Sequence, residues 1–265
     1  MRLFGPFRAG PLVATLLTWL LMPPSAQAQE VHRLGVGFGI GRSYQIGTPG
    51  GSIDRPYMRF RSGPNHILSV WYENEQLNSR WTLRGGFSWA ERGYWMAQER
   101  FANPWFREAY FKIMPTYDFV SCWMSAGYSL WTTERIRLEA FAGLSVSMVG
   151  LSAFTGGGGS EGANVTPLDF RVRYDYQFSE RAYTTAEPLG GLNLRWRTER
   201  KFFRRLSYWL VCSVPTRSLD HIGYWVEETH RSESTVYEGR WRSRMANWTL
   251  GLSYDLYSWG RAKRS

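Results

Sequence analysis

The strongest constraint on the fold is a repeated alternation of apolar with small or polar residues. In residues 33–41, RLGVGFGIG, every second residue is large and apolar, and most of the others are glycine. The same period of two recurs at 81–90, 136–148, 191–197 and 248–256. Successive side chains of a β-strand point to opposite faces, so this period predicts strands with one apolar and one small or polar face. We therefore expect an all-β chain.

These segments, together with weaker apolar segments between them, predict about eight strands. The region 108–131 contains Pro115 and is longer than one regular strand, so we expect a bend or bulge there, or two separate elements. Division into two elements would make the strand count uneven. The expected strands are 31–43, 65–75, 80–95, 108–131, 135–150, 188–198, 204–215 and 245–257.

The connections between the predicted strands alternate in length. Outer-membrane barrels have short turns on the periplasmic side and long loops outside the cell, whereas a soluble β-sandwich has no reason to sort its connections. A strand of about 9–11 residues crosses a bilayer at a tilt. We therefore expect a transmembrane, antiparallel, up-and-down β-barrel. The short connections are 76–79, 133–134 and 199–203, and the long ones are 43–64, 96–107, 151–187 and 216–244.

The first 28 residues have the layout of a secretory signal peptide. Arg2 and Arg8 give a basic start, residues 12–22 are apolar, and Ala-Gln-Ala at 26–28 provides small residues for cleavage. The apolar stretch is too short to cross a bilayer core of about 30 Å as a helix. We expect cleavage directly after this segment, which leaves residues 29–265 as one barrel domain in the outer membrane of a Gram-negative cell.

The composition fits such a barrel better than other classes. Aromatic residues make up 17% of the chain, although the mean hydropathy is −0.38. A disordered chain would be poor in aromatic residues, and a helical membrane protein would have apolar runs of about 20 residues. In a barrel, Trp and Tyr near strand ends form girdles at the membrane interfaces. The residues expected there are Trp89, Tyr94, Trp95, Trp131, Tyr208, Tyr254, Tyr257 and Trp259.

Three short motifs occur in the order found in a known family. Residues 81–93, WTLRGGFSWAERG, have an aromatic-Ser pair shortly before a basic-Gly pair. Residues 110–115, YFKIMP, are similar to a Tyr-Leu-x-Ile-Pro strand with one residue inserted, and FAGL at 141–144 looks like the small-residue strand that follows. The chain thus resembles the PorT-like outer-membrane β-barrel family of Bacteroidetes-type bacteria. The resemblance implies the barrel fold and an outer-membrane location, and no catalytic residues.

A second resemblance lies near the C-terminus. Residues 249–256, TLGLSYDL, match the polar-x-Gly-x-x-aromatic-x-hydrophobic signal by which the barrel-assembly machinery recognises a final strand. Barrels of this kind usually end on an aromatic residue, whereas this chain continues beyond Trp259 to a basic tail. The signal residues are Thr249, Gly251, Tyr254 and Leu256.

Charged residues fall on or near the small and polar faces of the predicted strands. Side chains fill the interior of a barrel of about eight strands, and an unpaired charge there would be very costly. We therefore expect a network of compensating charges across the lumen and no wide channel, with an ion pathway as the alternative. The expected network comprises Glu73, Arg84, Arg137, Glu139, Arg195, Arg197 and Asp255.

Few residues suggest catalysis or metal binding. The four histidines show no metal-ligand spacing, and we expect neither a metal nor a cofactor. His230 and Ser232 resemble the His-x-Ser pair of the lipid A deacylases, which are also eight-stranded barrels, although Glu233 replaces the Asn that usually follows. Cys122 and Cys212 lie on strands that we do not place side by side, so we do not favour a disulfide between them.

We expect a small, monomeric outer-membrane barrel with a structural or surface-binding role. Its expected partners are outer-membrane lipid, the barrel-assembly machinery during biogenesis and, through arginine-rich loops, lipopolysaccharide phosphates. Nucleic acid is not an expected partner. The alternatives are a lipid A deacylase-like acyl hydrolase and a secreted soluble barrel that binds an apolar ligand among inward aromatic residues. The loop arginines are Arg55, Arg59, Arg61, Arg171, Arg173, Arg240, Arg242 and Arg244.

Overall fold

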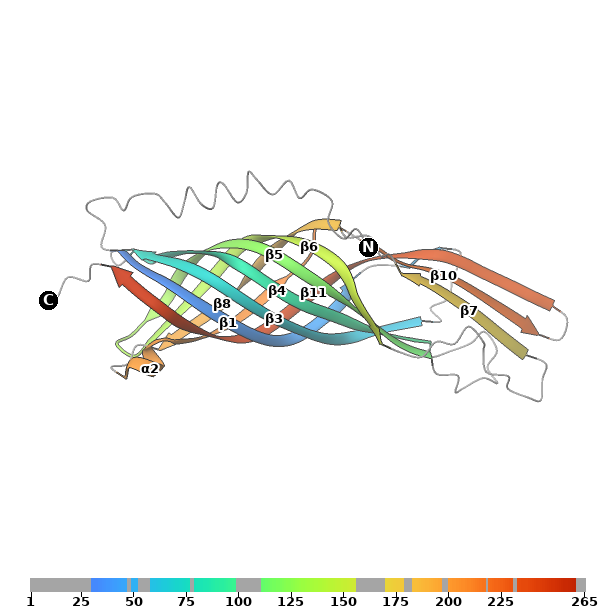
Figure 1. Cartoon of the computed structure of the whole chain (residues 1–265), viewed down its shortest axis with the longest axis horizontal. Helices are drawn as coiled ribbons and strands as arrows, with labels where there is room; N and C mark the ends of the chain where they lie inside the picture. The colour runs from blue at the N-terminus through green and yellow to red at the C-terminus, as the bar shows by residue number, and fades with distance from the viewer. Residues whose placement is uncertain are drawn as a thin grey trace.

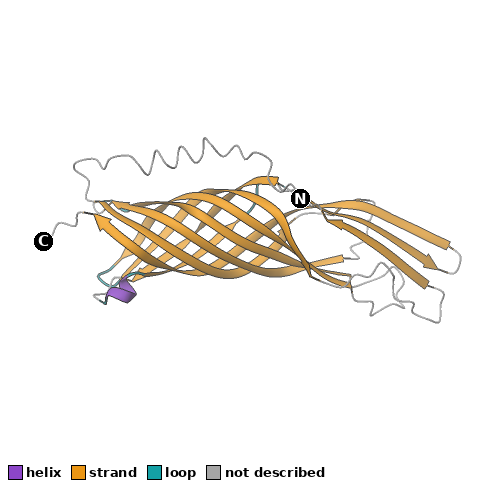
Figure 2. Cartoon of the chain, viewed as in Figure 1, coloured by secondary structure: helices purple, strands orange, loops and turns teal. Residues whose placement is uncertain are grey.

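A computed structural model of the chain consists almost entirely of β-strands in the residues that it describes (Figure 2). The predicted signal peptide lies outside these residues. The described ranges are 30–46, 49–51, 58–76, 79–98, 111–155, 170–178, 183–196, 200–217, 219–230 and 233–260.

Eight antiparallel strands form a closed barrel (Figure 1). They follow one another around the barrel in chain order, and the first pairs with the last. The prediction of an antiparallel, up-and-down barrel of eight strands is therefore confirmed. The barrel strands are β1 (Glu30–Ile46), β3 (Met58–Gln76), β4 (Trp81–Gln98), β5 (Phe111–Thr132), β6 (Ile136–Thr155), β8 (Tyr183–Trp196), β9 (Leu206–Ser213) and β11 (Glu233–Gly260).

The region around Pro115 belongs to one continuous strand, β5. Its register against β6 shifts between Thr116 and Tyr117, directly after the proline. Proline has no N–H to give to the ladder, and a bulge is where a strand accommodates it. The bulged alternative is therefore correct, and a division into two elements is wrong.

The loop end of the barrel carries additional strands. β7 (Phe170–Phe178) and β10 (Leu219–His230) pair with each other, and β10 pairs with residues 233–243 of β11. The short β2 (Pro49–Gly51) also pairs with β11. We call this sheet the extension; it projects beyond the barrel (Figure 1).

The extension corrects the prediction that residues 151–187 and 216–244 are loops. These connections are long, as predicted, but they contain β7, β10 and the first part of β11. Residues 219–230 lack the strict alternation that identified the barrel strands. Their hydrogen-bonded partners on β11 and β7 make them a strand, and such pairing is not visible in the local sequence.

Short connections lie at the opposite end of the barrel, which we call the turn end. Residues 133–135 link β5 to β6, and the β8–β9 connection contains α2 (Lys201–Arg204). Glu30 and Gly260 also lie at this end, because β1 and β11 pair there. In the part of the chain that the structure describes, no helix is long and apolar enough to span a membrane.

The apolar faces of the barrel strands point outward. Phe38, Ile40 and Leu250 each expose half or more of their side chain, and similar residues occur on the other barrel strands. The buried side chains, in contrast, are mostly Ser, Thr, Asn, Glu and Arg. This is the reverse of a soluble protein. A soluble barrel with its apolar faces turned inward, one of the alternatives, does not match this arrangement.

The aromatic residues divide between the two faces. Trp131, Tyr257 and Trp259 are exposed on the outside at the turn end, where an aromatic girdle was expected. The assignment of Tyr94 to a girdle is wrong, because its side chain is fully buried inside the barrel, stacked on Tyr117 with ring centroids 6.4 Å apart. Tyr94 follows an even-numbered inward series on β4 and therefore faces the lumen.

Two glycines on β1 and β11 make room for one inward tryptophan. A Cβ atom on Gly39 would lie 2.5 Å from a ring carbon of Trp209, and a Cβ on Gly251 would also collide with this ring. The indole of Trp209 therefore occupies the space into which a side chain at position 39 or 251 would point. The alternating glycines are a packing requirement of a narrow lumen.

We predict that Gly251→Ala destabilises the folded barrel by about 1–3 kcal/mol, the usual cost of overpacking. The matched control is Gly150→Ala, since a Cβ on Gly150 would meet no atom within 4 Å. Urea titration of the refolded protein in detergent micelles measures both effects. Equal stability of the two variants would contradict the close approach of Trp209.

Candidate functional site: the charged interior of the barrel

Glu73 on β3 lies at the centre of the charged interior. Its fully buried carboxylate accepts hydrogen bonds from Arg195 on β8, at 2.6 Å to Oε1 and 3.2 Å to Oε2. Arg33 on β1 and Arg84 on β4 also donate to this carboxylate. One carboxylate thus joins three strands other than its own, and the contact with Arg195 crosses the lumen.

Further ion pairs extend this arrangement into a cluster. The Arg33 guanidinium lies 2.6 Å from Glu75, and Arg84 lies 2.5 Å from Glu139. Arg137 pairs with both Glu75 and Glu139. Asp255 on β11 lies 3.5 Å from Arg33 and 3.8 Å from Arg195. We call these residues the turn-end cluster: Arg33, Glu73, Glu75, Arg84, Arg137, Glu139, Arg195 and Asp255.

The turn-end cluster combines four arginines with four carboxylates, so its formal charges cancel. Charge-assisted hydrogen bonds are short and strong, and desolvated ions require such partners. The cluster therefore fills one end of the lumen without leaving a net charge inside.

The structure brings together most of the residues predicted for a charge network. Six of them belong to the turn-end cluster, namely Glu73, Arg84, Arg137, Glu139, Arg195 and Asp255. Arg197 lies outside the described residues. Arg33 and Glu75 were missed, although each has the same odd-numbered parity as inward neighbours on its own strand. Parity alone was therefore a sufficient signal for these two residues.

A separate ion pair lies nearer the loop end and was also missed. Arg92 on β4 donates to both carboxylate oxygens of Glu187 on β8, at 3.0 and 2.9 Å. Ser213 donates to the same carboxylate at 3.0 Å. The Arg92 guanidinium stacks over the ring of Phe119 at 3.9 Å. We call Arg92 and Glu187 the loop-side pair.

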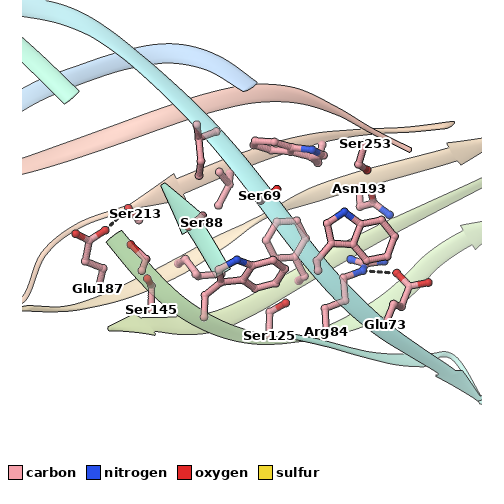
Figure 3. Close-up of a pocket in the computed structure, with 18 of the residues that line it drawn as sticks. Ser69, Glu73, Arg84, Ser88, Ser125, Ser145, Glu187, Asn193, Ser213 and Ser253 are labelled. Carbon is pink, nitrogen blue, oxygen red and sulfur yellow. Dashed lines mark hydrogen bonds and ion pairs between the residues drawn. The ribbon is translucent and has the colours of Figure 1, made fainter. Parts of the chain in front are cut away.

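A cavity of about 120 Å³ lies between the turn-end cluster and the loop-side pair. Figure 3 places Glu187 and Ser213 toward one end and Glu73 and Arg84 toward the other, with several serines between them. This volume is large enough for several water molecules. Its walls also include the rings of Trp71, Trp123, Phe141 and Trp209.

Hydrogen bonds between neutral side chains link the strands in and beside the cavity. The Asn65 amide donates to Thr249 Oγ1 at 2.6 Å, and the Asn247 amide donates to Ser213 Oγ at 2.7 Å. The hydroxyls of Ser207 and Ser253 lie 2.6 Å apart. Among the described residues, the interior is thus a polar, packed core with a cavity between its two charged ends.

The residues of the final-strand signal all lie on β11. Thr249 and Gly251 face the interior, where Thr249 binds Asn65 and Gly251 meets Trp209. Leu256 is exposed on the outer face, and the Tyr254 ring lies 6.0 Å below the Arg205 guanidinium. β11 is the strand that pairs with β1 and closes the barrel.

The residues that resemble a deacylase pair lie far from the barrel wall. His230 and Glu233 pair in register at the tip of the β10–β11 hairpin, and Ser232 lies outside the described residues. Residues 233–243 separate this tip from the part of β11 that pairs with β1, a distance of roughly 35 Å at about 3.3 Å per residue. A site beside the outer leaflet of a membrane therefore gains no support.

The described residues contain no group of His, Cys, Asp and Glu side chains arranged to bind a metal. Cys122 on β5 and Cys212 on β9 are both free thiols. β6 and β8 lie between their strands.

The sequence matches no protein-family model and no curated protein sequence. Among solved structures, the chain is similar to the attachment invasion locus protein Ail of Yersinia pestis, with 11% identity over 87% of this chain and 99% of that one and a TM-score of 0.37. It is also similar to the outer membrane protein OprG of Pseudomonas aeruginosa, with 10% identity over 86% and 97% and a TM-score of 0.37. These likenesses are too distant to assign a function.

We predict that Glu73→Gln destabilises the barrel by about 3–5 kcal/mol, because it leaves three arginines without their shared buried carboxylate. The exposed Glu134, on the β5–β6 turn, provides the control Glu134→Gln, which should leave stability unchanged. Urea unfolding in micelles measures both variants. A loss no greater than that of the control would show that the turn-end cluster does not hold the interior together.

Proposed function

We propose that this chain is a small outer-membrane β-barrel protein with a plugged lumen and a structural or surface-binding role. The observation that carries the proposal is the exposed apolar face of the barrel strands around a polar interior. Soluble monomers rarely expose large continuous apolar patches. A closed barrel satisfies its backbone hydrogen bonds internally, so a barrel with an apolar outer surface is stable in the hydrocarbon core of a bilayer.

The spacing of exposed aromatic residues supports a membrane span. Trp81 and Trp89 on β4 are both exposed and lie eight residues apart, while Trp248 and Trp259 on β11 lie eleven apart. At about 3.4 Å per residue and a tilt of about 40°, these separations correspond to roughly 20–30 Å along the barrel axis. An apolar band of about 25 Å between aromatic girdles is typical of outer-membrane barrels.

The plugged lumen and the partners follow from the same geometry. The turn-end cluster and the loop-side pair occupy the interior, which supports a barrel without a wide pore. Every wall strand is paired on both sides, which supports the proposal that the protein is a monomer. The final-strand signal lies on β11, the strand that closes the barrel, which supports recognition by the barrel-assembly machinery. We also propose, from the three sequence motifs, that the chain is related to the PorT-like outer-membrane barrels.

We predict that the protein fractionates with outer membranes and shows heat-modifiable migration on a gel. In bilayers, Phe38→Arg should cost roughly 2–4 kcal/mol, because Phe38 lies exposed near the middle of β1. Ile46→Arg, at the loop end of the same strand, is the matched control and should cost less than about 1 kcal/mol.

Urea-dependent folding into phospholipid vesicles measures this difference. In a soluble protein, both substitutions would place an arginine on a water-facing surface, and neither would be costly. Equal effects of the two variants, or a freely soluble periplasmic product, would contradict the proposal.

The extension supports a surface-binding role, since it projects from the barrel on the side of the long connections. By register, positions 171, 173 and 240 share one face of the extension, together with the acidic positions 175, 227 and 238. Arginines bind phosphates in a bidentate manner, so lipopolysaccharide is the proposed ligand.

We predict that replacing Arg171, Arg173 and Arg240 by Gln weakens lipopolysaccharide binding several-fold without changing barrel stability. Binding of purified lipopolysaccharide to the refolded protein measures the effect. Unchanged affinity would remove lipopolysaccharide as the ligand of this face.

A further inference from the structure

We propose that the β8–β9 turn is a binding site for the phosphate groups of anionic phospholipids in the leaflet at the turn end. The site comprises residues 200–205, RKFFRR, which include α2, and we call it the α2 turn. This inference rests on the proposed membrane location and adds a specific lipid contact to it.

The α2 turn presents two phenylalanines to the surroundings of the barrel. Phe202 is 59% exposed and Phe203 is 46% exposed, although both are large and apolar. Phe202 lies 5.9 Å from the ring of Tyr254, on the outer face of β11. In water this exposure is unfavourable, whereas at a membrane surface such residues enter the acyl region and anchor the segment.

Basic side chains flank these two rings. Arg204 and Arg205 are exposed, and the first turn of α2 contains no acidic residue. Arg200 and Lys201 precede the phenylalanines, so the six residues carry four basic groups. Guanidinium groups bind phosphate oxygens by charge-assisted, bidentate hydrogen bonds. The α2 turn therefore combines an apolar anchor with a phosphate-binding charge.

The turn is fixed to the barrel at the level of the outer aromatic residues. The Asp255 backbone N–H donates to the Arg205 carbonyl at 2.9 Å, and the Arg204 N–H donates to the Arg200 carbonyl at 3.1 Å. Figure 2 shows the helix at the turn end of the barrel. Exposed Tyr257 and Trp259 on β11 lie at the same end. The arginines are thus held at headgroup level in the membrane orientation proposed above.

The apolar component decides between a lipid and a free anion. A free phosphate would use the arginines alone and would leave both phenylalanines in water. An anionic phospholipid provides both groups at once. Its phosphate can bind the arginines while its acyl chains contact the neighbouring phenylalanines. The apolar component thus favours a phospholipid over inorganic phosphate. Four basic residues, with no acidic residue in the first turn of α2, favour a headgroup with a net negative charge, such as that of phosphatidylglycerol, over a zwitterionic headgroup.

The test is native mass spectrometry of the refolded full chain in detergent with equal amounts of phosphatidylglycerol and phosphatidylcholine. We expect the wild-type barrel to retain phosphatidylglycerol preferentially. Arg204→Gln/Arg205→Gln removes two of the four basic groups and should lower this preference several-fold, because charge-assisted hydrogen bonds to the lipid phosphate are lost. Phe202→Ser/Phe203→Ser should lower retention of phosphatidylglycerol as well.

Arg80→Gln/Arg135→Gln is the matched control, since these exposed arginines lie on the other two turns of the same end. This variant removes the same charge and should keep the preference. Equal loss in the two double variants would overturn the proposal in favour of a general charge effect. Displacement of the lipid by excess inorganic phosphate, with no effect of the phenylalanine variant, would overturn it in favour of a free-anion site.

Heat-modifiable migration of each variant verifies that the barrel is folded before lipid binding is measured. A wild-type protein that never reaches the outer membrane would refute the proposed function through its fractionation. A folded wild-type barrel with no phosphatidylglycerol preference would refute the α2 turn site alone.

Discussion

The pairing of β1 with β11 is the contact on which the rest of the structure depends. It runs from Val31 opposite Gly260 to Ile46 opposite Arg244 and leaves the wall without an open edge. Closure satisfies the backbone of every wall strand, and the outside of the barrel then needs no polar side chains. Closure with eight strands also makes the lumen narrow, so whatever points inward must fit a small, shared space.

The interior solves this packing problem with two kinds of pairing. Glycines on β1 and β11 stand opposite bulky rings such as Trp209, and carboxylates stand opposite guanidinium groups around Glu73. Buried ion pairs do not by themselves make a protein more stable, because desolvation offsets much of their attraction. Their effect here is to specify one arrangement of the side chains in the lumen. Any other arrangement would leave a buried charge without its partner.

The two ends of the barrel differ in a way that bears on function. At the loop end, the wall continues into the extension, and this end presents a sheet with both arginine and glutamate positions. At the turn end, short connections keep exposed aromatic residues and the α2 turn close to the barrel rim. In the proposed membrane orientation, the loop end carries the proposed surface for a partner outside the bilayer, and the turn end carries the proposed lipid contacts.

The sequence alone determined the barrel strands and their faces, because alternation can be read within each strand without knowing which strands pair with it. It also predicted Glu73, Arg84 and Arg195 for the interior. Arg84 and Arg195 share the parity of small or polar inward residues on their strands, and Glu73 lies on a strand with weaker alternation. Only the tertiary structure decided that Arg195 meets Glu73, 122 residues away, that Tyr94 stacks inside, and that residues 219–230 form a strand. These contacts depend on register and on closure of the barrel, which no local pattern specifies.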